Sequence, residues 1–192
     1  MSPETQQWFA VLKEPKAINC CVFPYSGSGV ASFASWKRGF SDEVGLFAAK
    51  LPGREDLLEQ PARTELLPLA SDFANAIYHS SFVDQPLVLA GFSLGALLAF
   101  EVARELRKLD VQVPLLFAGA ARAPQGRWLR GQLHKLKKDD DFIKRLNQLY
   151  SAIPQSVIDD PAARSLLLPI IRADITLFET YKYSADEPLD CE

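Results

Sequence analysis

One serine lies in a sequence pattern that could support covalent catalysis. Ser93 is the centre of Gly91-Phe92-Ser93-Leu94-Gly95, which matches G-x-S-x-G, the pattern of a nucleophile elbow. In an elbow the serine lies at a sharp turn between a strand and a helix, where free N–H groups and the helix dipole stabilise a developing negative charge. Gly91 and Gly95 fit such a turn because it leaves little room for side chains. A helix N-cap serine between two turn glycines is the alternative interpretation.

The residues around this motif favour the catalytic interpretation. Pro86-Leu87-Val88-Leu89-Ala90 is too short for a helix and apolar on both faces, as buried parallel strands are. After the motif a helix is predicted from Ala96 to about Leu109, because Leu98, Val102 and Leu106 recur at helical spacing. The sequence therefore predicts the strand, turn and helix that an elbow requires.

A serine that attacks a carbonyl also needs two N–H donors to stabilise the oxyanion. The N–H of Leu94, directly after the serine, is the first candidate. The loop Tyr25-Ser26-Gly27-Ser28-Gly29 follows a predicted strand over residues 17–23, and its start, around Tyr25 and Ser26, is the candidate for the second. Taken alone, this loop is equally well interpreted as a plain connecting turn.

Short apolar runs and helical patterns alternate along the first two thirds of the chain. Strands are predicted at residues 44–51 and 114–119, and a helix at residues 66–77. This alternation predicts an α/β fold with a mostly parallel sheet and helices on both faces. Residues 125–183 give helical signals without a convincing strand, which indicates a helical lid insertion. The length favours one domain over residues 1–192.

The composition excludes several other classes of protein. A formal net charge of −3 with 23% charged residues gives no basic excess for binding nucleic acid. Three cysteines, two of them adjacent at Cys20 and Cys21, favour a reducing compartment over a disulfide framework. Residues 1–16 lack the pattern of a secretory leader, and no run approaches the roughly 20 apolar residues of a membrane span. We predict a soluble cytoplasmic protein with no nucleic-acid or membrane partner, no cofactor and no metal ion.

Several separate segments along the chain form an ordered set. They are Phe23-Pro24-Tyr25-Ser26-Gly27, Trp36, Leu51-Pro52-Gly53-Arg54-Glu55, the elbow with Ala96, Phe100-Glu101 and Ala103-Arg104, Arg122-Ala123-Pro124, and Arg172-Ala173-Asp174 with Glu179, Tyr181 and Tyr183. In their residues and their order these segments resemble type II thioesterases of the α/β-hydrolase superfamily. The resemblance covers essentially the whole chain, and it is specific because the segments are many and ordered.

The resemblance implies an activity and a partner. Type II thioesterases accompany non-ribosomal peptide and polyketide synthases, with relatives in fatty-acid biosynthesis, and remove unwanted acyl groups from the phosphopantetheine thiol of acyl or peptidyl carrier proteins. By this resemblance Ser93 attacks the thioester, and the N–H groups of Leu94 and Ser26 hold the oxyanion. Family members more often have His at the position of Phe92, which implies a local change of pocket character.

Neither histidine suits the general base of a triad, whose order is Ser, Asp or Glu, then His. His79 precedes Ser93 and is expected at the opposite edge of the sheet. His134 has the right order but lies in the predicted helical insertion, away from any strand end.

No carboxylate suits the triad acid either. The loop after residues 114–119 reads Ala120-Ala121-Arg122-Ala123. The resemblance places the acid after the next strand and the base in a Gly-Gly-His-like loop beyond it, whereas Asp186, Asp190 and Glu192 are expected to precede that strand. We therefore expect the acid, the base and the terminal strands to be missing from a sequence that is incomplete at its C-terminus, leaving a sheet edge and apolar surface uncovered.

A basic stretch between Arg127 and Arg145 is a candidate docking site, because carrier proteins are typically acidic. A solvated helix face is the alternative. Its basic residues are Arg127, Arg130, Lys135, Lys137, Lys138, Lys144 and Arg145, against the acidic residues Asp139, Asp140 and Asp141.

The sequence as a whole indicates an acyl-thioester hydrolase that works through a Ser93 acyl-enzyme. One alternative is a non-catalytic binder of carrier protein or acyl groups on the same fold, which a stop codon after Glu192 would favour over a continuing reading frame with Asp and Gly-Gly-His. Another is a different serine esterase, which a comparison of oxygen esters with thioesters would reveal.

Residues 1–192 alone are expected to hydrolyse no acyl-thioester measurably, because a serine without its base is a poor nucleophile. Hydrolysis of an acyl-pantetheine should be compared for this chain and for a form extended through the missing region. Only the extended form should turn over, and robust turnover by the short form contradicts the prediction.

Overall fold

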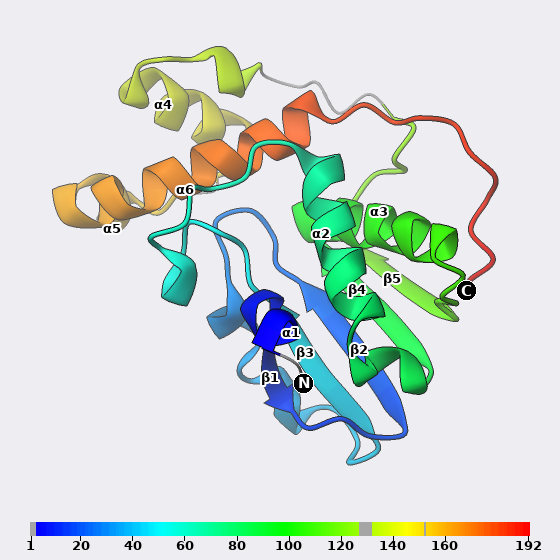
Figure 1. The fold of residues 1–192 in the computed structure, drawn as a ribbon. Helices are drawn as coiled ribbons and strands as arrows, with labels where there is room; N and C mark the ends of the chain where they lie inside the picture. The colour runs from blue at the N-terminus through cyan, green and yellow to red at the C-terminus, as the bar shows by residue number, and fades with distance from the viewer. Residues whose placement is uncertain (1–2, 127–131, 152) are drawn as a thin grey trace.

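Five strands of the described residues form one sheet (Figure 1). The computed structural model describes residues 3–126, 132–151 and 153–192. The sheet has the order β1-β3-β2-β4-β5, made of β1 (Phe9–Lys13), β2 (Ile18–Phe23), β3 (Val44–Ala49), β4 (Leu87–Phe92) and β5 (Leu115–Gly119). Strands β2 to β5 pair in parallel, whereas β1 is antiparallel to β3. The predicted α/β class is confirmed, and the four predicted strands are all present.

The first strand, β1, was not predicted. It follows α1 (Pro3–Trp8) and pairs Phe9 with Ala49 at the end of β3. Within β1, Phe9 is the one residue that is fully buried. A short edge strand with a single buried residue carries little periodic signal, because its outer side faces solvent.

The two faces of the sheet are covered differently. Side chains alternate along a strand, so Cys21 and Phe23 of β2 pack in the core with α2 (Leu66–Tyr78) and α3 (Leu94–Lys108). Cys20 and Val22 face the other way, toward Phe33 and Trp36 in the 3-10 helices η1 (Val30–Phe33) and η2 (Trp36–Arg38). Helical segments therefore lie on both faces, α-helices on one and short 3-10 helices on the other.

An aromatic cluster fixes α2 and β1 onto the end of β2. Phe73 of α2 meets Phe23 and Phe9 edge to face, with ring centroids 5.3 and 5.5 Å apart. Phe82, in η4 (Ser81–Asp84), contacts Phe9 and Phe47 from the next connection. Edge-to-face pairs of buried rings have defined geometry as well as large apolar area. The cluster thus holds the strand from which the 24–29 loop emerges.

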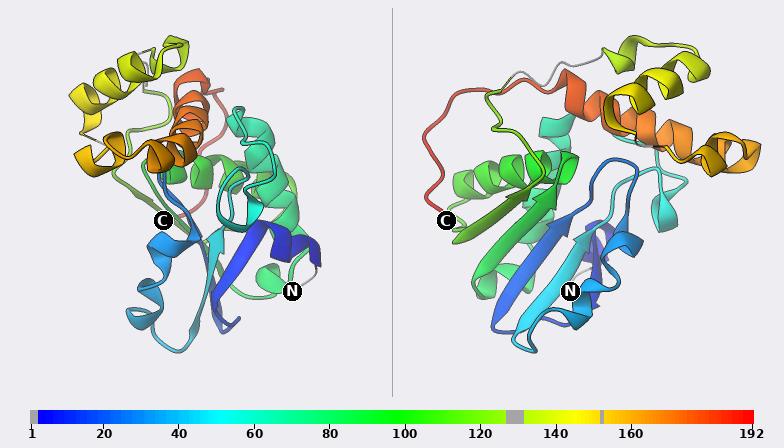
Figure 2. Two further views of the ribbon diagram at one scale, coloured as in Figure 1. Left: turned by 90° about the vertical axis from the view of Figure 1, so that its left-hand side faces the viewer. Right: turned by 180° about the vertical axis from the view of Figure 1, so that it is seen from behind.

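A second group of helices lies over the carboxyl ends of the strands (Figure 2). This helical layer consists of η5 (Leu133–Lys135), α4 (Asp139–Tyr150), α5 (Gln155–Ile158) and α6 (Pro161–Thr180). It has a core of its own, formed by Leu133, Phe142, Ile143, Leu146, Ile153, Leu168 and Ile175. In the described part of the chain, α6 and every other helix lack the length and apolar composition needed to span a bilayer.

The segment after α6 runs back along α3 (Figure 1). At its start the hydroxyl of Tyr181 donates to the buried carboxylate of Glu101 on α3, at 2.5 Å. Burial and the adjacent carboxylate raise the pKa of Tyr181, so the phenol keeps the proton that it donates. Further along, Arg107 of α3 pairs with Asp186 at 2.7 Å. Residues 181–192 and the end of α6 are thereby tied to the helix that begins directly after Ser93.

The last residue lies beside β5. The N–H of Glu192 donates to the carbonyl of Pro114, and the N–H of Leu116 donates to the carbonyl of Glu192, at 3.1 and 3.0 Å. This pair of bonds is the pattern of a parallel bridge. Leu115 and Phe117 of β5 are 41% and 53% exposed, so this edge of the sheet presents the apolar surface that was expected.

Candidate functional site

The elbow has the geometry that the sequence predicts. β4 ends at Phe92, α3 begins at Leu94, and Ser93 between them has φ 52° and ψ −115°. Its N–H donates to the carbonyl of Gly119 at the end of β5, at 2.9 Å. A positive φ is uncommon for a residue with a side chain, and here the neighbouring strand holds the backbone in place. The side chain of Ser93 is thereby displayed at the start of α3.

The two glycines of the motif are required by close backbone approach. A Cβ added to Gly91 would collide with the carbonyl oxygen of Gly95, and one added to Gly95 would collide with the carbonyl oxygen of Phe23. The elbow therefore packs directly against the end of β2. Because the obstacles are backbone atoms, no side-chain rearrangement can make room for a larger residue.

The loop after β2, residues 24–29, contains a tight turn. The N–H of Ser28 donates to the carbonyl of Tyr25 at 3.0 Å, and Gly27 has φ 77°, as glycine at the third position of a type II turn does. Such a turn uses neither the N–H of Ser26 nor that of Gly27. The N–H of Gly27 donates instead to Oδ2 of Asp174 on α6, at 2.7 Å.

A buried ion pair between Arg54 and Asp174 is hydrogen-bonded to this loop. Nη1 and Nη2 of Arg54 donate to Oδ2 and Oδ1 of Asp174 at 2.9 and 2.6 Å, and Nη1 also donates to the carbonyl of Ser28 at 2.8 Å. The side chains of Arg54 and Asp174 are only 6% and 0% exposed. Charges are buried at tolerable cost only when they are paired and hydrogen-bonded, and a forked guanidinium on a carboxylate meets both needs. The connection after β3, the 24–29 loop and α6 are joined in this way.

The neighbour of Arg54 secures the far end of the same loop. The carboxylate of Glu55 accepts from the N–H groups of Val30 and Ala31, at 2.9 and 3.1 Å. These are N–H groups at the start of η1, which have no partner within the helix. Glu55 itself adopts φ 51°. Two adjacent residues after β3 thus hold the 24–29 loop at Ser28 and the backbone that directly follows the loop.

The elbow, the 24–29 loop and the helical layer enclose a cavity of about 690 Å³. Ser93, Leu94 and Ser26, the three predicted site residues, all line it. The remaining lining residues are mostly apolar: Tyr25, Gly27, Ser28, Ser32, Phe33, Trp36, Phe92, Ala120, Leu146, Tyr150, Ile153, Pro154, Val157, Leu167, Ile171, Ile175 and Phe178. None of the lining residues that the described chain contributes is an Asp, Glu or His.

Phe92 forms part of an aromatic wall of this cavity. Its ring meets Trp36 edge to face, with centroids 5.6 Å apart, and lies 5.7 Å from the ring of Phe117. Gly119 leaves room for it, since an added Cβ there would contact the Phe92 ring at 2.6 Å. The residue before the nucleophile is therefore an apolar packing residue in this chain.

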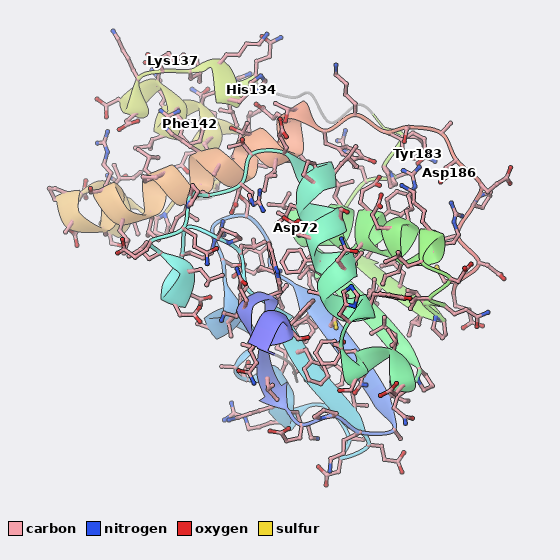
Figure 3. The ribbon with its side chains drawn as sticks, viewed as in Figure 1. Asp72, His134, Lys137, Phe142, Tyr183 and Asp186 are labelled. Atoms are coloured by element: carbon pink, nitrogen blue, oxygen red, sulfur yellow. The ribbon has the colours of Figure 1, made fainter. Side chains whose placement is uncertain are left out.

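The two histidines lie elsewhere. His79 is exposed and caps the carboxyl end of α2, before the chain enters β4. His134, in η5, has Nδ1 2.6 Å from Oε2 of the buried Glu179 on α6, and its backbone N–H donates to the same oxygen at 2.9 Å (Figure 3). This pair fastens η5 to α6, and neither histidine is among the cavity-lining residues that the structure describes.

A serine elbow at the carboxyl end of a mostly parallel sheet, beneath a layer of helices, defines a protein of the α/β-hydrolase type. The family model described as a thioesterase domain matches residues 19–191. The chain belongs to this thioesterase family.

Known relatives agree with this assignment. The gramicidin S biosynthesis protein GrsT of Aneurinibacillus migulanus is 32% identical, with 98% of this chain and 73% of GrsT covered. RedJ, the thioesterase from the prodiginine pathway of Streptomyces coelicolor, is 31% identical with a TM-score of 0.82, covering 95% of this chain and 72% of RedJ. YbtT, the type II thioesterase from the yersiniabactin NRPS/PKS pathway, is 28% identical with a TM-score of 0.79, covering 92% and 71%. The resemblance to type II thioesterases is confirmed.

Gly95→Ala should destabilise the fold by about 3 kcal/mol, because the added methyl meets backbone at the end of β2 and cannot be repacked. Denaturant unfolding measures the change. Gly39→Ala is the matched control: the nearest atom to its added Cβ is the Trp36 carbonyl oxygen at 3.5 Å, so its stability should change by less than about 0.5 kcal/mol. Equal stability of the two variants would refute the close approach of the elbow to β2.

Proposed function

We propose that the chain carries the nucleophile, oxyanion donors and acyl pocket of a hydrolase that releases acyl groups from the phosphopantetheine arm of carrier proteins. The observation that supports it is the meeting of Ser93, Leu94 and Ser26 on the wall of one apolar cavity, in a chain of the thioesterase family. An apolar cavity of this volume suits the acyl part of such a substrate.

The proposed reaction uses the described geometry directly. Ser93 Oγ attacks the thioester carbonyl carbon as its hydroxyl proton passes to a general base, which the described cavity lining does not supply, and the electron pair of the C=O bond moves to oxygen. The N–H groups of Leu94 and Ser26 donate to that oxyanion, and the start of α3 adds the favourable end of the helix dipole. The C–S bond then breaks and the thiolate leaves readily, since thiols have pKa values near ~8.5. Water releases the acid from the acyl-serine.

We also propose that Ser93 is not activated by residues 1–192 alone. The support is that no Asp, Glu or His of the described chain lines the cavity, while His79 and His134 have other positions. The same observation supports a second candidate function, in which the cavity binds acyl groups or carrier protein without turnover.

The helical layer is proposed as a lid, corresponding to the predicted lid at residues 125–183, and as a docking surface. Asp139 and Asp140 of α4 pair with Arg172 and Arg164 of α6, at 2.8 and 2.5 Å. Two of the three acidic residues in the basic stretch are therefore neutralised within the layer, while its described cations, Lys135, Lys137, Lys138, Lys144 and Arg145, are exposed (Figure 3 shows Lys137). Arg127 and Arg130 lie outside the described residues. An acidic carrier protein is the partner that this surface suits.

Ser93→Ala, in a form extended through the carboxyl-terminal region, should lower kcat for an acyl-pantetheine by about 10³-fold or more, because the acyl-enzyme can no longer form. Mass spectrometry of the unsubstituted form should find the acyl adduct on Ser93. Ser41→Ala, at an exposed serine that does not line the cavity, is the control and should keep its activity. An adduct on another residue, or faster cleavage of oxygen esters than thioesters, speaks against the proposal.

Reversing three exposed charges, Lys135→Glu, Lys137→Glu and Lys138→Glu together, should raise KM for carrier-bound substrate about tenfold through loss of electrostatic attraction. KM for free acyl-pantetheine should stay unchanged. Lys16→Glu, an exposed residue at the amino end of β2, is the control. An unchanged KM for the carrier-bound substrate removes the docking proposal.

A further inference from the structure

Asp174 joins α6 to the turn that presents Ser26. We propose that Asp174 is a positioning residue that couples the position of α6 above the sheet to the shape of the 24–29 loop. The Ser26 N–H then points at the oxyanion only while α6 keeps the position that the structure shows. This inference rests on the proposed function, since it assigns the control of one of the two oxyanion donors. Asp174 itself does not line the cavity that the described residues form, so it acts through Gly27.

The turn needs an external restraint. Type I and type II turns differ by a flip of their central peptide, which here joins Ser26 to Gly27. Glycine at the third position permits either orientation at little steric cost. The bond from the Gly27 N–H to Asp174 Oδ2 fixes this peptide, while the bond from Ser28 to Tyr25 closes the turn. The Ser26 N–H belongs to the preceding peptide, whose Tyr25 carbonyl accepts from the N–H and the hydroxyl of Ser28. Its direction is therefore fixed only while the turn as a whole keeps this shape.

Asp174 is itself held rigidly. Both of its carboxylate oxygens accept from Arg54, and the same guanidinium donates to the Ser28 carbonyl, on the other side of the turn. Both side chains are almost fully buried. If α6 moves, the carboxylate of Asp174 cannot move with the helix and also keep its hydrogen bonds to Arg54 and to the Gly27 N–H.

A second contact from α6 reaches the same glycine. Ile171, one helical turn before Asp174, lies against Gly27, because a Cβ added to that glycine would be 3.3 Å from Ile171 Cγ1. One face of α6 thus gives Gly27 both a hydrogen-bond acceptor and an apolar neighbour. Displacement of α6 removes both at once.

The same helix forms one wall of the cavity, through Leu167, Ile171, Ile175 and Phe178. An acyl chain that packs against these residues stabilises α6 in the position that the structure shows. Because coupling between two events is reciprocal, acyl binding and order in the 24–29 loop should promote each other. A phosphopantetheine arm without an acyl group would not pack against α6 and would not promote order in the 24–29 loop.

A double substitution tests the coupling without leaving a buried charge unpaired. Arg54→Met with Asp174→Met removes both charges and the acceptor of Gly27, and such apolar replacement of a buried pair is often tolerated. Arg172→Met with Asp139→Asn is the matched control, since it removes another ion pair of α6 that does not touch the loop. Arg54→Leu with Asp174→Leu, which likewise removes both charges, is a second variant, for use if the first does not fold.

Amide hydrogen exchange of the 192-residue chain gives the first readout. The Gly27 and Ser28 amides, which donate to Asp174 and to the Tyr25 carbonyl, should exchange about tenfold faster in the double variant, with protection in β2 and α3 unchanged, because only a local restraint is lost. The control variant should exchange as the parent does. Unchanged exchange of these two amides overturns the coupling.

Kinetics of the extended form give the second readout. The double variant should lose about 30-fold in kcat for acyl-pantetheine, somewhat less than removal of a whole oxyanion donor costs, with KM changed by less than about twofold. Equal losses in both variants, or a rise in KM alone, would indicate a merely structural role and overturn the proposal. Inactivity of the unsubstituted extended form contradicts the proposed function instead, and the exchange measurement still decides the coupling.

Discussion

The ion pair of Arg54 and Asp174 is the interaction on which the arrangement of the site depends. It joins three segments that are distant in the chain: the connection after β3, the loop after β2 and the middle of α6. Removing one partner alone would leave a charge buried without compensation, which costs far more than loss of a surface pair. The pair therefore makes the helical layer part of the site's framework. A helical layer held only by apolar contacts could shift without affecting the 24–29 loop.

The elbow adds a constraint of a different kind, because it works through the absence of side chains. Gly91 and Gly95 allow the start of α3 to lie directly against the end of β2. The aromatic cluster around Phe23 and Phe73 then packs α2 against the end of β2. Ser93 and the 24–29 loop are consequently placed by one strand end, and their relative position does not depend on long side chains. Rigid placement of this kind is what a preorganised oxyanion site requires.

The sequence predicted those features that local spacing encodes. The elbow and the four parallel strands follow from residues near each other in the chain, where periodicity and turn chemistry are strong signals. The choice of Ser26 as a neighbour of the nucleophile came instead from the resemblance to the family. Arg54 and Asp174 were part of the family resemblance, but their pairing spans 120 residues and no spacing rule can indicate it. The pairing of His134 with Glu179 escaped notice for the same reason. β1 was missed because one buried residue makes no pattern.

The backbone angle of Ser93 sets a conflict between folding and chemistry. At φ 52° any residue with a Cβ costs of order 1–3 kcal/mol, and glycine would relieve most of that cost while keeping the turn. A chain selected for thermal stability alone would therefore drift toward glycine here and lose its hydroxyl. Engineering for stability should accordingly leave this position alone and seek its gains elsewhere, for example in the exposed apolar residues of β5.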